Sequence, residues 1–210
     1  MTDARVHLDV PEPWRRLPIA PDGDARGQRA LIDGWLVEQG RGLTDDGSID
    51  KVVTKLAVES RRASREAVGF AAILLDLLPV AEGGAALLVG SLSVSFRHLP
   101  GETDPAVAAH GTLDVLRQQL TGARYATRRL ELVGLGADPG RPAVLVRDQR
   151  FSAGVALSVC QVLWLVAGSS QLASVAVATP NRELAQEFTE VALRVATSLR
   201  VEPVREMAGS

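Results

Sequence analysis

The chain has 210 residues, of which 23 are basic and 25 acidic, so its formal charge is -2 at pH 7. This length suits one domain, which at this size buries enough surface to fold without disulfides or metals. The near-neutral charge argues against a nucleic-acid-binding protein, which normally carries a basic excess. Because Cys160 is the single cysteine, an intrachain disulfide and a zinc site built from cysteines are excluded.

The N-terminal part predicts a strand, then two helices, then two strands. Residues 6–10 alternate apolar and polar side chains, as a half-buried strand does. Apolar residues at helical spacing predict a helix that ends near Glu38, and Ser48 can cap a second helix with an apolar stripe. Strands are then expected over residues 68–78 and 85–96.

The second of these strands has two different faces. Large apolar side chains alternate in it with small polar ones, namely Leu92, Val94 and Phe96 with Ser91, Ser93 and Ser95. One face is therefore expected in the core and the other wet or lightly covered. A sheet face formed by these serines together with the arginines described below is one candidate binding surface, and the helices between Asp24 and Arg65 are another.

A helix and two further strands are expected next. Asp104 followed by Pro105 is a typical helix start, an N-cap with proline in the first turn. The side of this helix expected to face inward consists of Ala106, Ala109, Leu113, Leu116 and Leu120. Strands over residues 124–133 and 143–150 are expected to pair through the glycine-rich turn 134–140.

No charged residue occurs from Phe151 to Asn181. Its most apolar part, residues 154–168, is shorter than the about 20 residues that a membrane-spanning helix requires. Turn-type residues at 168–171 interrupt the apolar run. The segment therefore predicts a hairpin of two buried strands and no membrane span.

The C-terminus predicts a helix and a tail. Thr179 followed by Pro180 is expected to start the helix, along which apolar residues from Leu184 to Leu199 align at helical spacing. The order of elements indicates an α+β protein: a single-domain α/β/α sandwich with a mostly antiparallel sheet of about six to seven strands covered by three to four helices. We expect residues 1–200 to form this domain and residues 201–210 a flexible tail.

Several motif-like segments lack an essential part of the motif. The glycines at 134–140 are not followed by a helix, which a dinucleotide-binding loop needs. Residues 44–50 imitate the centre of a calcium loop, but Gly42 and Val53 stand where aspartate and glutamate ligands belong. No catalytic residue, cofactor-binding residue or metal ligand is therefore predicted, and no cofactor.

The histidines and the cysteine receive structural interpretations. His110 is expected to form a surface pair with Asp114, four residues further along the same helix. Cys160 lies in an uncharged predicted strand and is expected to be an inert core thiol. Neither residue therefore predicts a catalytic site.

Arginines on the two paired strands are the strongest candidates for a binding site. The candidates are Arg128, Arg129, Arg147 and Arg150. Such a cluster can bind carboxylate or phosphate groups bidentately. The alternative, which we favour, is a solvated face on which arginines form cross-strand pairs with acidic residues.

The two ends of the chain resemble the PsbP-like superfamily. The N-terminal residues 8–14 read as a strand running into a VPxxW pattern, and the C-terminal hairpin leads through Ala178-Thr179-Pro180 into a helix that closes on Ser198-Leu199-Arg200. That superfamily is an α/β/α sandwich shared by a Ran-binding nuclear import factor, a photosystem extrinsic subunit, bacterial lipoproteins and secretion-effector chaperones. The resemblance implies a binding or adaptor module without shared catalytic residues.

Three functions remain open at this point. The first is a non-enzymatic protein-binding module, a secretion-associated chaperone or accessory protein of an actinobacterium, because arginine-rich and alanine-rich composition resembles proteins from such organisms. The second is a small-anion-binding protein or an enzyme that uses the Arg128 and Arg147 face. The third is a structural homo-oligomer. The expected partner is another protein, and a cytoplasmic location is expected because the N-terminus lacks the apolar stretch of a secretory signal.

Overall fold

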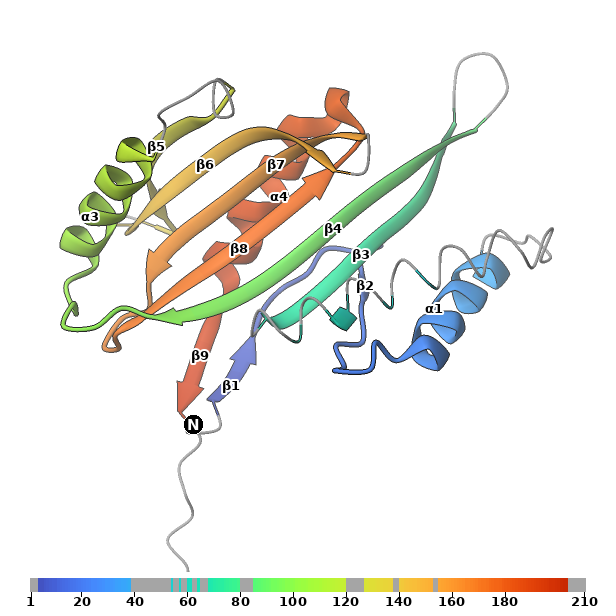
Figure 1. The fold of residues 1–210 in the computed structure, drawn as a ribbon, viewed down its shortest axis with the longest axis horizontal. Helices are drawn as coiled ribbons and strands as arrows, with labels where there is room; N and C mark the ends of the chain where they lie inside the picture. Colours follow the sequence, from blue (N-terminus) through green and yellow to red (C-terminus); the bar gives the residue numbers. More distant parts are fainter. Residues whose placement is uncertain are drawn as a thin grey trace, which may run out of the picture.

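A seven-stranded antiparallel sheet forms the centre of the protein (Figure 1). The computed structural model describes residues 4–38, 54, 57, 60, 61, 64, 68–79, 85–119, 127–137, 140–152 and 155–203. The strands of the sheet, in spatial order, are β2 (Arg15–Arg16), β3 (Val68–Pro79), β4 (Ala85–His98), β8 (Gln171–Thr179), β7 (Val155–Leu165), β6 (Arg141–Ser152) and β5 (Arg129–Leu135). The predicted single-domain α+β fold with an antiparallel sheet is confirmed.

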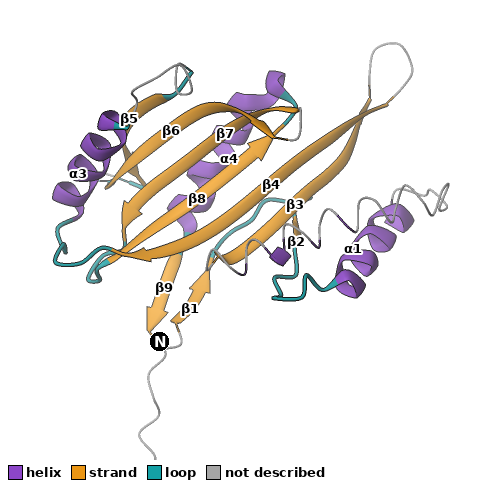
Figure 2. Ribbon diagram, in the orientation of Figure 1, coloured by secondary structure: helices purple, strands orange, loops and turns teal. Residues whose placement is uncertain are grey.

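Helices lie on both faces of this sheet, as Figure 2 shows. They are α1 (Ala25–Glu38), α3 (Pro105–Gln118) and α4 (Ala185–Ser198), with a short 3-10 helix, η2 (Arg182–Leu184), before α4. Helix α4 covers one face, here called the α4 face. Helices α1 and α3 lie at opposite ends of the other face, the α3 face. Within the described residues, no helix is long and apolar enough to cross a membrane.

The main core lies between the sheet and α4. Side chains alternate between the faces of a strand, and along β4 this directs Leu92 and Val94, both fully buried, into the core. Phe188 and Val195 of α4 pack into the same cluster, as the helical spacing predicted. The expected alternation of β4 is confirmed, because the intervening serines lie on the α3 face.

Gly90 of β4 lets two aromatic rings approach the sheet. A Cβ atom at this position would lie 2.4 Å from Cε1 of Phe188 and 2.9 Å from Cη2 of Trp14. The two rings meet edge to face, with centroids 5.8 Å apart. The missing side chain of Gly90 is therefore what allows Trp14 and Phe188 to close this part of the core.

Helix α3 forms as predicted at its start but differs in its buried side. The Asp104 carboxylate accepts hydrogen bonds from the amides of Ala106 and Val107 and so caps the helix. Ala109 and Leu113 pack on the sheet as expected, whereas Ala106 is exposed, which corrects the prediction. The side of the helix that faces the sheet begins with Ala108 and Ala109, which are both buried. Ala106 lies outside this side.

Contacts between distant parts of the chain correct two predicted boundaries near the C-terminus. Residues 201–203, expected in the tail, belong to β9 (Arg200–Pro203), which pairs antiparallel with β1 (Ala4–His7). Thr179 does not cap the last helix: its hydroxyl donates to the carbonyl of Val89 on β4, and α4 begins only at Ala185. Cross-strand pairing and a hydrogen bond to β4 thus override the local patterns at both places.

The helical segment after α1 falls largely outside the described residues. Thr54, Ala57, Ser60, Arg61 and Ser64 are helical. The predicted start at Ser48, the calcium-like residues 44–50 and residue 120 at the end of α3 lie outside the described part of the chain.

Replacing Gly90 by alanine is expected to lower the free energy of unfolding by about 1–3 kcal/mol, because the new methyl group would overlap Phe188 and Trp14. Urea denaturation would measure this. Gly111→Ala is the matched control: a Cβ there meets no atom within 4 Å, and the position is helical, so stability should rise by about 0.5–1 kcal/mol. Equal stability of both variants would contradict the packing at Gly90.

Candidate functional site

A groove of about 980 Å³ crosses the α3 face of the sheet. Strands β4, β8 and β7 form its floor, and α3 forms one wall. Figure 1 shows this part of the sheet between α3 and α1, with neither helix lying over it. The groove is therefore a hollow on a part of the α3 face that neither α1 nor α3 covers, and its volume is at the upper end of the roughly 300–1,000 Å³ typical of ligand pockets.

The wall of the groove carries an exposed apolar stripe of α3. Val107, Gly111 and Val115 follow one another at four-residue spacing and line the groove. The two valines remain 56% and 53% exposed. Helix α3 is thus apolar on two sides: Ala109 and Leu113 face the core, and this second stripe faces open space.

The floor of the groove is made of small and polar side chains. Ser93 and Ser95 of β4 are half-buried, and neither hydroxyl forms a hydrogen bond within the described part of the chain. Next to them, the side-chain amide of Gln161 donates to the hydroxyl of Ser174 over 2.8 Å. The floor therefore offers both hydrogen-bond donors and acceptors.

Charged side chains line the groove at both ends. Arg97, opposite Leu172 on β8, and Glu102, just before α3, line one end, and Arg150, opposite Leu157 on β7, lines the other. Glu102 already accepts backbone hydrogen bonds ahead of α3 through Oε1. Two guanidinium groups against one carboxylate give the described lining a positive balance.

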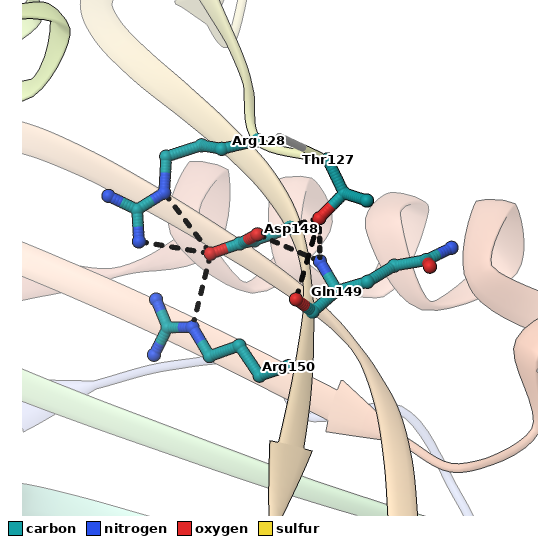
Figure 3. Close-up of polar contacts among 5 residues, drawn as sticks. All are labelled: Thr127, Arg128, Asp148, Gln149 and Arg150. Atoms are coloured by element: carbon teal, nitrogen blue, oxygen red, sulfur yellow. Dashed lines mark hydrogen bonds and ion pairs between the residues drawn. The ribbon is translucent and has the colours of Figure 1, made fainter. Parts of the chain in front are cut away.

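Arg150 belongs to a cluster around the buried carboxylate of Asp148 (Figure 3). Asp148 Oδ2 accepts from Nε and Nη2 of Arg128, at 3.1 and 3.0 Å, and from Nε of Arg150 at 3.3 Å. Asp148 Oδ1 accepts from the Gln149 amide and the Thr127 hydroxyl. One carboxylate thus holds two guanidinium groups, and the terminal nitrogens of Arg150 form no hydrogen bond within the described residues.

The environment of Asp148 acts on its pKa in opposite directions. Burial would raise this pKa, but hydrogen bonds and charge from Arg128 and Arg150 outweigh burial and leave it below its usual value. The side chains of Asp148 and Arg128 are only 2% and 10% exposed. Asp148 is therefore a structural anion that orients both arginines.

The four candidate arginines lie on both faces of the sheet. The predicted pairing of their strands is confirmed, with Arg129 opposite Arg147. Alternation along β6 places Arg147 on the α4 face and Arg150, with Arg128, beside Asp148 on the α3 face. Arg147 also pairs with Glu131, so cross-strand ion pairs form as the preferred alternative predicted. The four residues therefore do not make a single surface.

The other singled-out residues lie apart from the groove. His110 binds the carbonyl of Ala106 through Nδ1 and Asp114 pairs with Arg117, so the expected pair of His110 with Asp114 is wrong. Cys160 is buried as predicted, and burial raises the pKa of its thiol to about 11. Within the described residues, no three histidine, cysteine or acidic side chains come together as a metal site would require.

The sequence pattern indicated the serine face of β4 that forms the floor of the groove, but the exposed valines of α3 that form its wall were not predicted. The valines of α3 have the four-residue spacing that marks a helix stripe, and this signal was available in the sequence. It was overlooked because the stronger stripe through Ala109 and Leu113 already accounted for helix burial. The groove itself depends on where α3 lies on the sheet.

Comparison with known proteins gives a structural likeness only. No model of a protein family matches the chain, and no curated protein matches it either. Among solved structures, a crystal structure of LpqN, which is involved in cell envelope biogenesis of Mycobacterium tuberculosis, is 12% identical. The match covers 96% of this chain and 86% of that one, with a TM-score of 0.44. A likeness at this level transfers no function to this chain.

Asp148→Asn is expected to lower the free energy of unfolding by about 3 kcal/mol at neutral pH, because the buried Arg128 would lose the carboxylate charge that accepts hydrogen bonds from its Nε and Nη2. The folded state holds the pKa of Asp148 below its ordinary value of 3.8. Its stabilising contribution is therefore complete above that value and lost as the pH falls through the lower folded pKa. Urea denaturation between neutral and acidic pH should show the two proteins converging in stability below pH 3.8.

Arg150→Gln serves as the comparison: Arg150 is 49% exposed, so solvent screens its charge and its loss should cost only about 0–1 kcal/mol. An Asp148→Asn protein as stable as the parent at neutral pH would show that Asp148 does not anchor the cluster.

Proposed function

We propose that this protein is a non-enzymatic binding module whose groove on the α3 face holds an apolar, acidic peptide segment of a partner protein. The observation that carries the proposal is the exposed stripe of Val107, Gly111 and Val115 above a floor of serine hydroxyls that have no hydrogen-bond partner among the described residues. A protein-binding role agrees with the adaptor function that the resemblance to the PsbP-like superfamily implies.

Apolar contact supplies the favourable free energy. Each of the two exposed valines would lose contact with water when a ligand fills the groove, and apolar burial stabilises by roughly 25 cal/mol per Å². Leu163 and Leu172 extend the apolar lining across the floor. An occupant with apolar side chains is therefore favoured.

The hydroxyls of the floor favour a peptide over a purely apolar chain. A hydrocarbon lying on Ser93 and Ser95 would separate these hydroxyls from water and offer no hydrogen bond in return, at a cost of about 1–3 kcal/mol for each. A peptide carries a donor and an acceptor in every residue other than proline. Its backbone can therefore pair with Ser93, Ser95 and Gln161 while its side chains contact α3.

Charge at the ends of the groove selects an acidic segment. Arg97 and Arg150 line opposite ends, and the terminal nitrogens of Arg150, whose orientation Asp148 sets, have no partner in the described part of the chain. Guanidinium groups bind carboxylates strongly because two parallel hydrogen bonds form. A segment with an acidic side chain or a chain terminus at one end would complete this arrangement.

Filling the groove from α3 tests the proposal. Gly111→Trp places a large side chain in the groove, where a Cβ meets nothing within 4 Å. Random linear peptides displayed on phage would be selected on the parent protein, and the selected peptides measured by fluorescence polarisation. We expect apolar, acidic sequences, with binding weakened by about tenfold or more in the Gly111→Trp protein.

The matched control is Gly34→Trp, because Gly34 is also an exposed helical glycine with nothing within 4 Å but lies on α1. This variant should bind the peptides as the parent does. Selection of no peptide, of basic peptides, or of peptides that bind both tryptophan variants equally would overturn the proposal. A dimer in light scattering that Gly111→Trp dissociates would assign the groove instead to a second copy of this chain.

A further inference from the structure

A second, smaller cavity lies on the α4 face of the sheet, opposite the groove. Its volume is about 430 Å³, and strands β6 and β7, the start of β5 and the start of α4 surround it. Three guanidinium groups line it, those of Arg129, Arg147 and Arg182. Glu183 is the one acidic residue of the described lining besides Asp148, whose carboxylate is bound by Arg128 and Arg150. The cavity is therefore basic.

The register of the sheet holds two of these arginines side by side. Arg129 on β5 lies directly opposite Arg147 on β6, and like charges in directly opposite positions destabilise a sheet. Glu131 offsets the charge of Arg147, whereas Arg129 forms no hydrogen bond or ion pair within the described residues. In addition, Nε of Arg147 is buried and has no partner among them. An anion between Arg129 and Arg147 would reduce the repulsion between their like charges and could accept a hydrogen bond from Nε of Arg147.

The third arginine reaches the cavity from η2. Nη2 of Arg182 donates to Oε1 of Gln149 over 3.1 Å, which holds its guanidinium above β6. Gln149 lies two residues after Arg147 on the same face of the strand. Three fork-shaped donor groups therefore border one cavity from three different elements.

We propose that this cavity binds a small molecule that carries a phosphate group, with Arg129 and Arg147 as its main ligands and Arg182 as a third. A phosphate offers three acceptor oxygens and close to two negative charges, which suits several guanidinium groups better than a single carboxylate does. The cavity exceeds the volume of a phosphate group alone, and Thr127 and Gln186 in its lining can bind a polar remainder. This site lies on the opposite face from the groove and does not depend on the proposed peptide binding.

Calorimetric titration with inorganic phosphate and with glycerol 2-phosphate tests the site. Both should bind saturably at low ionic strength, the ester at least as tightly as the inorganic ion. Arg129→Gln should weaken both by about tenfold or more, since a charge-assisted contact is lost. Arg147→Gln should do the same, but Arg129→Gln is the cleaner variant because, among the described residues, Arg129 has no ion pair to break whereas Arg147 pairs with Glu131.

Arg26→Gln on α1 removes the same charge from an exposed position outside the cavity and should bind both compounds as the parent does. Circular dichroism would show that all variants are folded. Equal weakening by Arg26→Gln, absence of saturable binding, or binding of inorganic phosphate alone would overturn the proposal. Binding to a lipid headgroup is the alternative, which vesicles of phosphatidylcholine and phosphatidic acid would reveal. If the protein sediments with these vesicles and glycerol 2-phosphate does not displace it, the arginines are assigned to the lipid headgroup.

Discussion

The alternation of side chains along the strands is the constraint on which the rest of this structure depends. Residues of even and odd number along β6 face opposite sides of the sheet, so Leu145 enters the α4 core while Val144 and Val146 lie under α3. The α4 face is covered by a continuous core, but α3 covers only one end of the other face. The difference in cover leaves the serines of β4 as the floor of an open groove.

The sequence was sufficient to predict the fold because its local patterns and the tertiary structure agree over most of the chain. Three local patterns predicted the structure that forms. The uncharged segment predicted the hairpin of β7 and β8, Asp104 with its following proline predicted the start of α3, and the apolar spacing predicted α4. The predictions were wrong where a distant contact decides the outcome. Thr179 bonds to β4 instead of capping a helix, and residues 201–203 pair with β1.

The candidate sites were less predictable for a physical reason. Grouping arginines by their position in a hairpin treats both faces as one, whereas a single step along a strand moves a side chain to the opposite face. Arg147 and Asp148 are neighbours in sequence, but their charged groups have different partners: Arg147 pairs with Glu131 and Asp148 with Arg128. The third arginine of the smaller cavity, Arg182, is brought there by η2, which no pattern in the hairpin indicates.

Both candidate sites lie mainly on regular elements, and this bears on how they would bind. The groove is built by three strands and a helix, and Arg150 is oriented by the buried Asp148. A ligand that meets side chains already held in place loses less binding free energy to ordering them. The small side chains of Ser93, Ser95 and Ala176 also explain why the groove exists: larger residues there would fill it from below. The depth of the groove therefore comes from the small size of its floor residues, and the orientation of the Arg150 guanidinium comes from Asp148. Substitutions can change these two properties separately.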